Sequence, residues 1–130
     1  MTSSLSKIEI LRIFKDKFIE FIDSLIAIFP EEADLIIVKL VFENQIPIEE
    51  SMQLFSSRII QASKMVRERN DDFFLKDNTL FMGIKEHRVV YWKNLWESRR
   101  LDHDDRSAIW NWFNLFLTLA EMYTQTIRYA

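Results

Sequence analysis

The residues best suited to catalysis or metal binding lie together in one short stretch, Asp102, His103, Asp104 and Asp105. Three carboxylates and one imidazole could hold a hard divalent cation or transfer protons as general acids and bases. Consecutive residues of a helix point in different directions, however, and acidic residues at a helix start satisfy its free backbone N–H groups. We therefore interpret Asp102 as a helix cap, with Asp105 three residues further on, and expect neither a metal site nor a cofactor.

Other routes to catalysis are scarce in this composition. The chain has no cysteine, which excludes disulfides, thiol nucleophiles and metal centres held by cysteine. Its only other histidine is His87, and no Gly-x-Ser-x-Gly turn presents a serine nucleophile. A single glycine cannot supply the glycine-rich loop that binds a dinucleotide or a nucleoside triphosphate. We predict that the protein is not an enzyme and has no catalytic residues.

A basic and aromatic segment, residues 85–100, suggests a different function. It has a net charge of +3 and interleaves cations with aromatic residues. Such a pattern can bind single-stranded nucleic acid, because bases stack on aromatic rings and cations contact phosphates. The alternative is that Trp92 and Trp96, four residues apart, form a core face and the cations form the solvated opposite face. The cations that would contact nucleic acid are Arg88, Lys93, Arg99 and Arg100.

Tryptophan and tyrosine are more frequent than a small core usually needs, and both are enriched at the energetic centres of protein interfaces. Trp110 and Trp112 project about 200° apart on a helix, so both are buried only if that helix is surrounded. Other helices of the same chain or a second copy of the chain could surround it, and the sequence leaves both open. The candidate interface residues are Trp96, Trp110, Trp112 and Tyr123.

The elements that would position these residues are predicted to be helices. One glycine and two prolines in 130 residues are too few for the turns of β-sandwiches, barrels or meanders. The hydrophobic content of 48% is enough for a folded core, so disorder is not expected. We predict an all-α protein, a compact bundle of five to seven helices, formed by a single domain over residues 1–130.

Apolar residues at alternating spacings of three and four predict the individual helices. Ser6 and Glu9 form a capping box for the first helix, and Pro30 and Pro47 are expected at helix starts. The second helix is apolar nearly all round, and a buried strand is its alternative. Residues 70–77 predict a short helical turn, followed by a second short segment. The predicted helices are Lys7–Ile28, Glu31–Phe42, Pro47–Arg67, Glu86–Ser98 and His103–Arg128.

The last predicted helix is apolar on almost all sides, which is typical of a buried helix. We expect it at the centre of the bundle, unless one of its faces meets another chain. The longest stretch without charge, residues 107–120, has 14 residues and is shorter than the ~18–20 that a membrane-spanning helix needs. We therefore expect no membrane span, and the absence of cysteine fits an intracellular protein.

Aromatic residues recur as anchors along most of the chain. They are Phe29-Pro30, Asp71-Asp72-Phe73-Phe74, Leu95-Trp96, Ala108–Phe113 and Leu119–Tyr123. In this pattern the chain resembles the short, acidic, all-helical proteins of large nucleocytoplasmic DNA viruses of eukaryotes. The resemblance rests on no chemical motif. It implies a virus-encoded helical module without a catalytic role, located in the host cytoplasm or the virion.

These observations predict a non-catalytic helical protein-interaction or structural module. Its expected partner is a protein, in the simplest case a second copy of the chain in a homo-oligomer. The alternative is a nucleic-acid or nucleoprotein adaptor that uses residues 85–100. The net charge of −3 lacks the strong basic excess of nucleic-acid-binding domains, which makes this alternative the less favoured one.

Overall fold

The computed structural model describes residues 5–44, 47–71, 90, 93–94, 96–98 and 101–128. These residues contain five α-helices and no strand, which confirms the all-α prediction. None of the described helices is both long and apolar enough to cross a membrane. The helices are α1 (Lys7–Ile28), α2 (Ala33–Asn44), α3 (Ile48–Gln61), α4 (Ser63–Arg67) and α7 (His103–Arg128).

Helix α1 has the predicted bounds and the predicted capping box. The Ser6 side chain accepts a hydrogen bond from the Glu9 N–H at 3.2 Å, and the Glu9 carboxylate accepts one from the Ser6 N–H at 3.1 Å. The carboxylate is stabilised by the Ser6 backbone N–H and then by the Ser6 side chain, so the pKa of Glu9 is lowered. Two of the free N–H groups at this helix start are therefore satisfied locally.

The second predicted element is a helix, α2, and not a strand, but it begins at Ala33 instead of the predicted Glu31. Pro30 and Glu31 form a turn instead of a first helical turn, and the N–H of Glu32 donates to the carbonyl of Phe29 at 3.0 Å. Phe29 is buried, so this turn keeps its ring in the core. The helix also extends beyond Phe42 to Asn44, whose side-chain amide donates to the Leu40 carbonyl at 2.9 Å.

The single helix predicted for Pro47–Arg67 was wrong, because the chain is interrupted at Ala62. The N–H of Ala62 is shared between the carbonyl of Ile59, at 3.1 Å, and that of Arg58, at 3.3 Å. Its backbone ψ of 11° departs from the helical value, and α4 begins at the next residue. No proline or glycine lies near this break, so it is a tightened turn of the 3₁₀ type.

Helix α7 has the bounds that the sequence predicts, and Asp102 caps it. The N–H of Asp105 donates to the Asp102 carboxylate at 2.8 Å, and the N–H of Asp102 donates to the Asp105 carboxylate at 3.2 Å. In the predicted helix Glu86–Ser98, the described residues 90, 93–94 and 96–97 are helical. The rest of that helix, and most of the predicted short turn at residues 70–77, lie outside the described residues.

The chain divides into two compact units. Unit 1 comprises residues 1–56 and 118–130, and unit 2 comprises residues 57–117. Helices α3 and α7 each supply residues to both units. The prediction of one domain stays a prediction.

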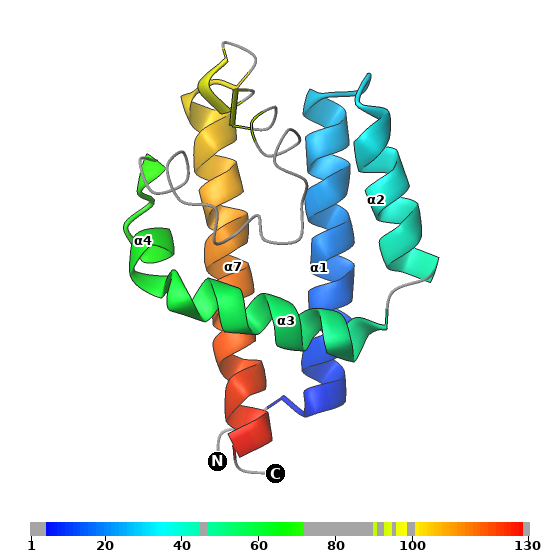
Figure 1. Ribbon diagram of the computed structural model, residues 1–130, viewed down its shortest axis with the longest axis vertical. Coiled ribbons are helices and arrows are strands. Elements are labelled where there is room, and N and C mark those ends of the chain that lie inside the picture. The colour runs from blue at the N-terminus through cyan, green and yellow to red at the C-terminus, as the bar shows by residue number, and fades with distance from the viewer. Residues whose placement is uncertain are drawn as a thin grey trace. The chain divides into compact units, whose positions relative to one another are not determined.

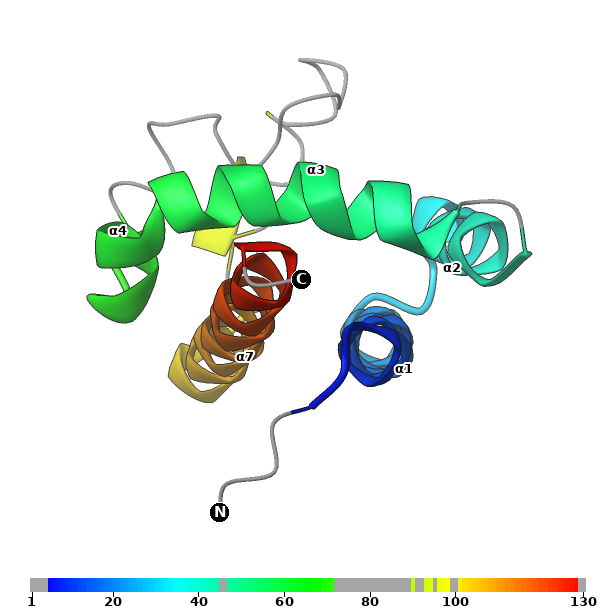
Figure 2. The same cartoon turned by 90° about the horizontal axis from the view of Figure 1, so that it is seen from below.

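Unit 1 is built on an antiparallel pair, α1 and α2, which lie side by side (Figures 1 and 2). Phenylalanine rings fill the space between these helices. The Phe18 and Phe42 rings stack with centroids 4.3 Å apart, and Phe14 meets Phe42 edge-on at 6.2 Å. The ring of Phe55, on the first part of α3, lies 5.5 Å from that of Phe14. Helix α1 thus packs against both α2 and the first part of α3.

Unit 2 is held by polar contacts from α4 to the first part of α7. Arg69 follows α4 with a φ of 53°, in the left-handed region that favours glycine. The Arg69 N–H donates to the Val66 carbonyl at 3.2 Å and the Asn70 N–H to the Met65 carbonyl at 3.1 Å, which is a Schellman motif. The Arg69 guanidinium donates to the Ser107 hydroxyl at 3.2 Å and to the Asn111 side chain.

Candidate protein-interaction surface

Helix α2 is apolar on two opposite sides, and only one of them faces the rest of unit 1. Leu35 and Phe42 lie on the inner side and are buried. The Phe42 ring contacts Phe14 and Phe18 of α1, which fixes the rotation of α2 about its axis. A helix rotated in this way must point its remaining apolar residues elsewhere.

The outer side of α2 carries Ile36, Ile37 and Leu40, which span roughly 100° of the helix and which we name the α2 exposed face. Val38 lies at its border with the buried side. The four side chains are between 43 and 56% exposed. Three large aliphatic residues in two turns of helix therefore meet solvent together.

Other large apolar residues at the surface are scattered. Ile8, Leu54, Val90 and Ile127 are also exposed, but each comes from a different segment of the chain. Single exposed apolar residues are normal on soluble proteins, whereas contiguous apolar patches mark contact surfaces. Among the described helices, α2 is the one that gathers several of them.

Two polar contacts join α2 to α1. The Lys39 ammonium lies 2.7 Å from the Asp23 carboxylate, and its hydrogen bond to Asp23 raises the pKa of Lys39. Lys15 of α1 donates to the backbone carbonyl of Glu43 at 3.3 Å. These two contacts hold the middle and the C-terminal end of α2 against α1, so the α2 exposed face is presented by a fixed helix.

Three of the four candidate interface residues are buried within the chain itself. Trp96 and Trp110 lie in unit 2, where their rings meet edge-on with centroids 5.8 Å apart. The Trp110 indole N–H donates to the Asp71 carboxylate at 2.9 Å. Tyr123 lies in unit 1 and is 1% exposed. Trp112 differs, since it is half-buried and stacks on Phe116 at 6.0 Å.

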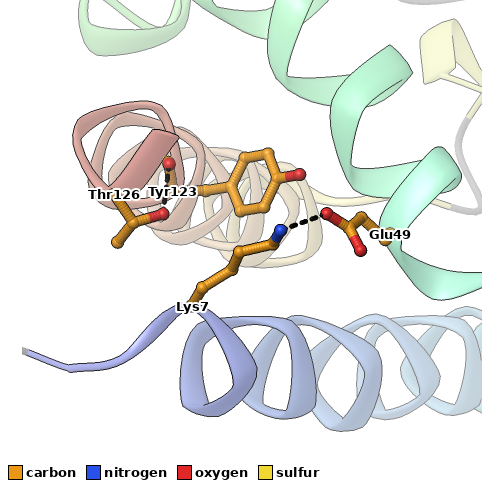
Figure 3. Close-up of polar contacts among 4 residues, drawn as sticks. All are labelled: Lys7, Glu49, Tyr123 and Thr126. Atoms are coloured by element: carbon orange, nitrogen blue, oxygen red, sulfur yellow. Dashed lines mark hydrogen bonds and ion pairs between the residues drawn. The ribbon is translucent and has the colours of Figure 1, made fainter. Parts of the chain in front are cut away.

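Lys7, Glu49 and Tyr123 form a cluster in unit 1 (Figure 3). The Lys7 ammonium forms an ion pair with the Glu49 carboxylate, and the hydrogen bond in this pair raises the pKa of Lys7. A nucleophilic or Schiff-base lysine requires a lowered pKa, so this lysine has the opposite electrostatics. The cluster therefore has the properties of a structural ion pair beside a buried ring.

The basic residues of the nucleic-acid alternative are largely beyond what the structure describes. Arg88, Arg99 and Arg100 lie outside the described residues, and Lys93 is half-buried. The guanidinium of Arg69, a cation outside this segment, donates to Ser107 and Asn111 of α7. Nucleic-acid binding by residues 85–100 stays a prediction.

The acidic stretch at the start of α7 acts as a cap. The carboxylates of Asp102 and Asp105 each accept a backbone N–H of the other residue. Among the described residues, no three acidic or histidine side chains gather in a way that could hold a metal ion. The expectation of a protein without metal, cofactor or catalytic residues stays a prediction.

Sequence reasoning missed the α2 exposed face, although its signal was present. Residues 33–44 are apolar nearly all round, a pattern that fits a buried strand as well as a helix with two apolar sides. A 12-residue helix with apolar residues on both sides buries one side and leaves the other for a partner, unless the chain surrounds it. The last helix, α7, is also apolar on almost all sides, and there most apolar residues are buried.

The chain matches no model of a protein family, no curated protein and no solved structure.

Proposed function

We propose that this protein is a non-catalytic helical protein-interaction module and that the α2 exposed face is its contact surface. The observation that supports the proposal is the grouping of Ile36, Ile37 and Leu40 on the outer side of a helix that is fixed by its inner side. Helix-in-groove recognition uses apolar anchors at this kind of spacing. A virus-encoded origin, as the resemblance implies, and an intracellular location are further parts of the proposal.

The size of the face sets the expected strength of binding. The three side chains of the face and the bordering Val38 are each about half exposed, which corresponds to two fully exposed side chains. Burying two aliphatic side chains contributes about 3–6 kcal/mol. Association itself costs at least about 4 kcal/mol in lost translational and rotational freedom. Contacts from the α2 exposed face alone therefore give weak, reversible binding, and a tighter complex needs further contacts around it.

The test is a library of displayed helical peptides selected on the wild-type protein. The selected peptides are then measured against Ile37→Gln/Leu40→Gln and against Leu54→Gln. Leu54 is a matched control because it is an aliphatic residue of similar exposure on α3. We expect most selected peptides to lose about tenfold or more in affinity for the double variant and little for the control. Equal affinity for all three proteins would contradict the proposal.

Self-association is a second form of the same proposal, and the half-buried Trp112 is its remaining aromatic candidate. Sedimentation equilibrium distinguishes it from binding to another protein. The occupant is a second copy if the mass of the wild type rises above 15.7 kDa with concentration while that of the double variant stays at 15.7 kDa. A strict monomer at high concentration removes self-association.

A further inference from the structure

The α2 exposed face has acidic residues at both of its ends. Glu31 and Glu32 precede α2, Asp34 lies in its first turn, and Glu43 lies in its last turn. The cation of this segment is Lys39, whose ammonium is 2.7 Å from Asp23 of α1. Residues 31–44 therefore have four acidic side chains and one basic one, a net charge of −3.

The whole of unit 1 has the same sign. It contains six Lys or Arg residues and eleven Asp or Glu residues, a net charge of −5. Unit 2 contains eleven and nine, a net charge of +2. The summed charge of a unit sets the potential over its surface and favours partners of opposite charge.

This charge disfavours two possible occupants of the face. If two copies of α2 packed against each other in antiparallel fashion, the acidic first turn of one would lie opposite Glu43 of the other. A parallel pair would place Glu31, Glu32 and Asp34 opposite the same residues of the second copy. Like charges in register oppose association in either case. Anionic lipid headgroups would meet the same repulsion.

We infer that the occupant of the α2 exposed face is an amphipathic helix of another protein, with an apolar stripe flanked by lysine or arginine. This inference rests on the proposed function and adds the chemistry of the partner. The apolar stripe covers Ile36, Ile37 and Leu40, and the flanking cations are attracted by the net negative charge of residues 31–44. Helix α2 has 12 residues and is about 18 Å long, so about three turns of the partner helix contact it.

The test uses a panel of synthetic helical peptides whose leucines are spaced at three and four residues, in several registers. Each register is made with flanking lysines, with flanking glutamates, and as a scrambled sequence of the lysine form. Binding of labelled peptides to the full chain is followed by fluorescence anisotropy at low salt. We expect the lysine peptides to bind about tenfold or more tightly than the glutamate peptides, and the scrambled ones to bind weakly.

Two sets of variants locate the effect. The triple variant Glu31→Gln/Glu32→Gln/Asp34→Asn should weaken the lysine peptides about tenfold and reduce the difference from the glutamate peptides. A matched control, Asp16→Asn/Glu20→Gln/Glu50→Gln, removes three acidic charges from α1 and α3 and should change binding less than about threefold. Raising the salt to about 0.5 M should remove most of the preference for lysine, because the charges are near the surface.

The outcomes separate this inference from the proposed function. If glutamate peptides bind as tightly as lysine peptides and Ile37→Gln/Leu40→Gln abolishes both, the partner chemistry is wrong and the contact surface is right. If the double variant binds the lysine peptides as the wild type does, the proposed function fails as well. If the wild type dimerises and Ile37→Gln/Leu40→Gln does not, the occupant of the face is a second copy and the inference is overturned. It is also overturned if no lysine peptide of any register binds.

Discussion

Replacing Tyr123 by phenylalanine is expected to stabilise the protein. The Tyr123 side chain is buried, and its hydroxyl has no hydrogen-bond partner within the described part of the chain. A hydroxyl buried in this way loses its hydrogen bonds to water on folding, which costs about 1–3 kcal/mol. Phenylalanine keeps the ring and omits the hydroxyl. We expect the free energy of unfolding to rise by about 1 kcal/mol, which corresponds to a rise of about 4 °C in Tm.

Urea denaturation followed by circular dichroism at neutral pH measures this change. Ser56→Ala is a parallel case, because Ser56 is also buried and its hydroxyl has no partner among the described residues. Its expected effect is neutral or slightly stabilising. Trp110→Phe is the contrasting case, since the Trp110 indole donates to Asp71 at 2.9 Å. Losing that bond and part of the ring should lower the free energy of unfolding by about 1–3 kcal/mol.

A loss of 1 kcal/mol or more in Tyr123→Phe would refute this reasoning, because it would show that the hydroxyl has a partner in the folded protein. The concentration dependence then identifies that partner. If the loss grows with protein concentration, the hydroxyl bonds to a second copy, and Tyr123 would be an interface residue as the sequence suggested. If the loss is independent of concentration, the partner lies within the chain.

Three further changes test the fold. Phe14→Ala removes the ring at the centre of the phenylalanine cluster and should lower the free energy of unfolding by about 3–5 kcal/mol in urea denaturation. Arg69 has a φ of 53°, so Arg69→Gly should be about 1 kcal/mol more stable than Arg69→Ala in the same assay, and the opposite order would be inconsistent with the left-handed conformation. The Ser6 N–H lowers the pKa of Glu9, so ionised Glu9 stabilises the folded state at neutral pH. The stability difference between wild type and Glu9→Gln should therefore disappear as the pH falls through the lowered folded-state pKa, and denaturation over a pH series measures it.

The sequence predicts the two long helices to the residue because their boundaries are set locally. Ser6 with Glu9, and Asp102 with Asp105, cap their helices through contacts only three residues apart. Such contacts depend on residue type and spacing, which the sequence contains. The start of α2 and the break at Ala62 depend on the tertiary structure instead. Burial of Phe29 sets the start of α2, and no proline or glycine near Ala62 marks the break there.

The candidate surface was not predictable for a related reason. Residues 33–44 are apolar on both sides, so the sequence alone does not say which side faces the core. The contacts of Phe42 with Phe14 and Phe18 decide this, and those rings lie more than twenty residues away in the sequence. Trp96 and Trp110 were ambiguous for the same reason, because their burial depends on each other.

Unit 1 is formed by two segments that are far apart in the sequence, and this has a consequence for synthesis on the ribosome. Unit 1 has its first segment at residues 1–56, but its core also includes Leu119, Ala120 and Tyr123 from its second segment. At about 5–20 residues per second, the ribosome adds the 61 intervening residues of unit 2 in about 3–12 s. During this delay the Phe14 cluster is already made while the side chains that complete its unit are still missing. The nascent chain therefore exposes apolar surface that the finished protein buries, and chaperones that bind such surface have several seconds in which to act.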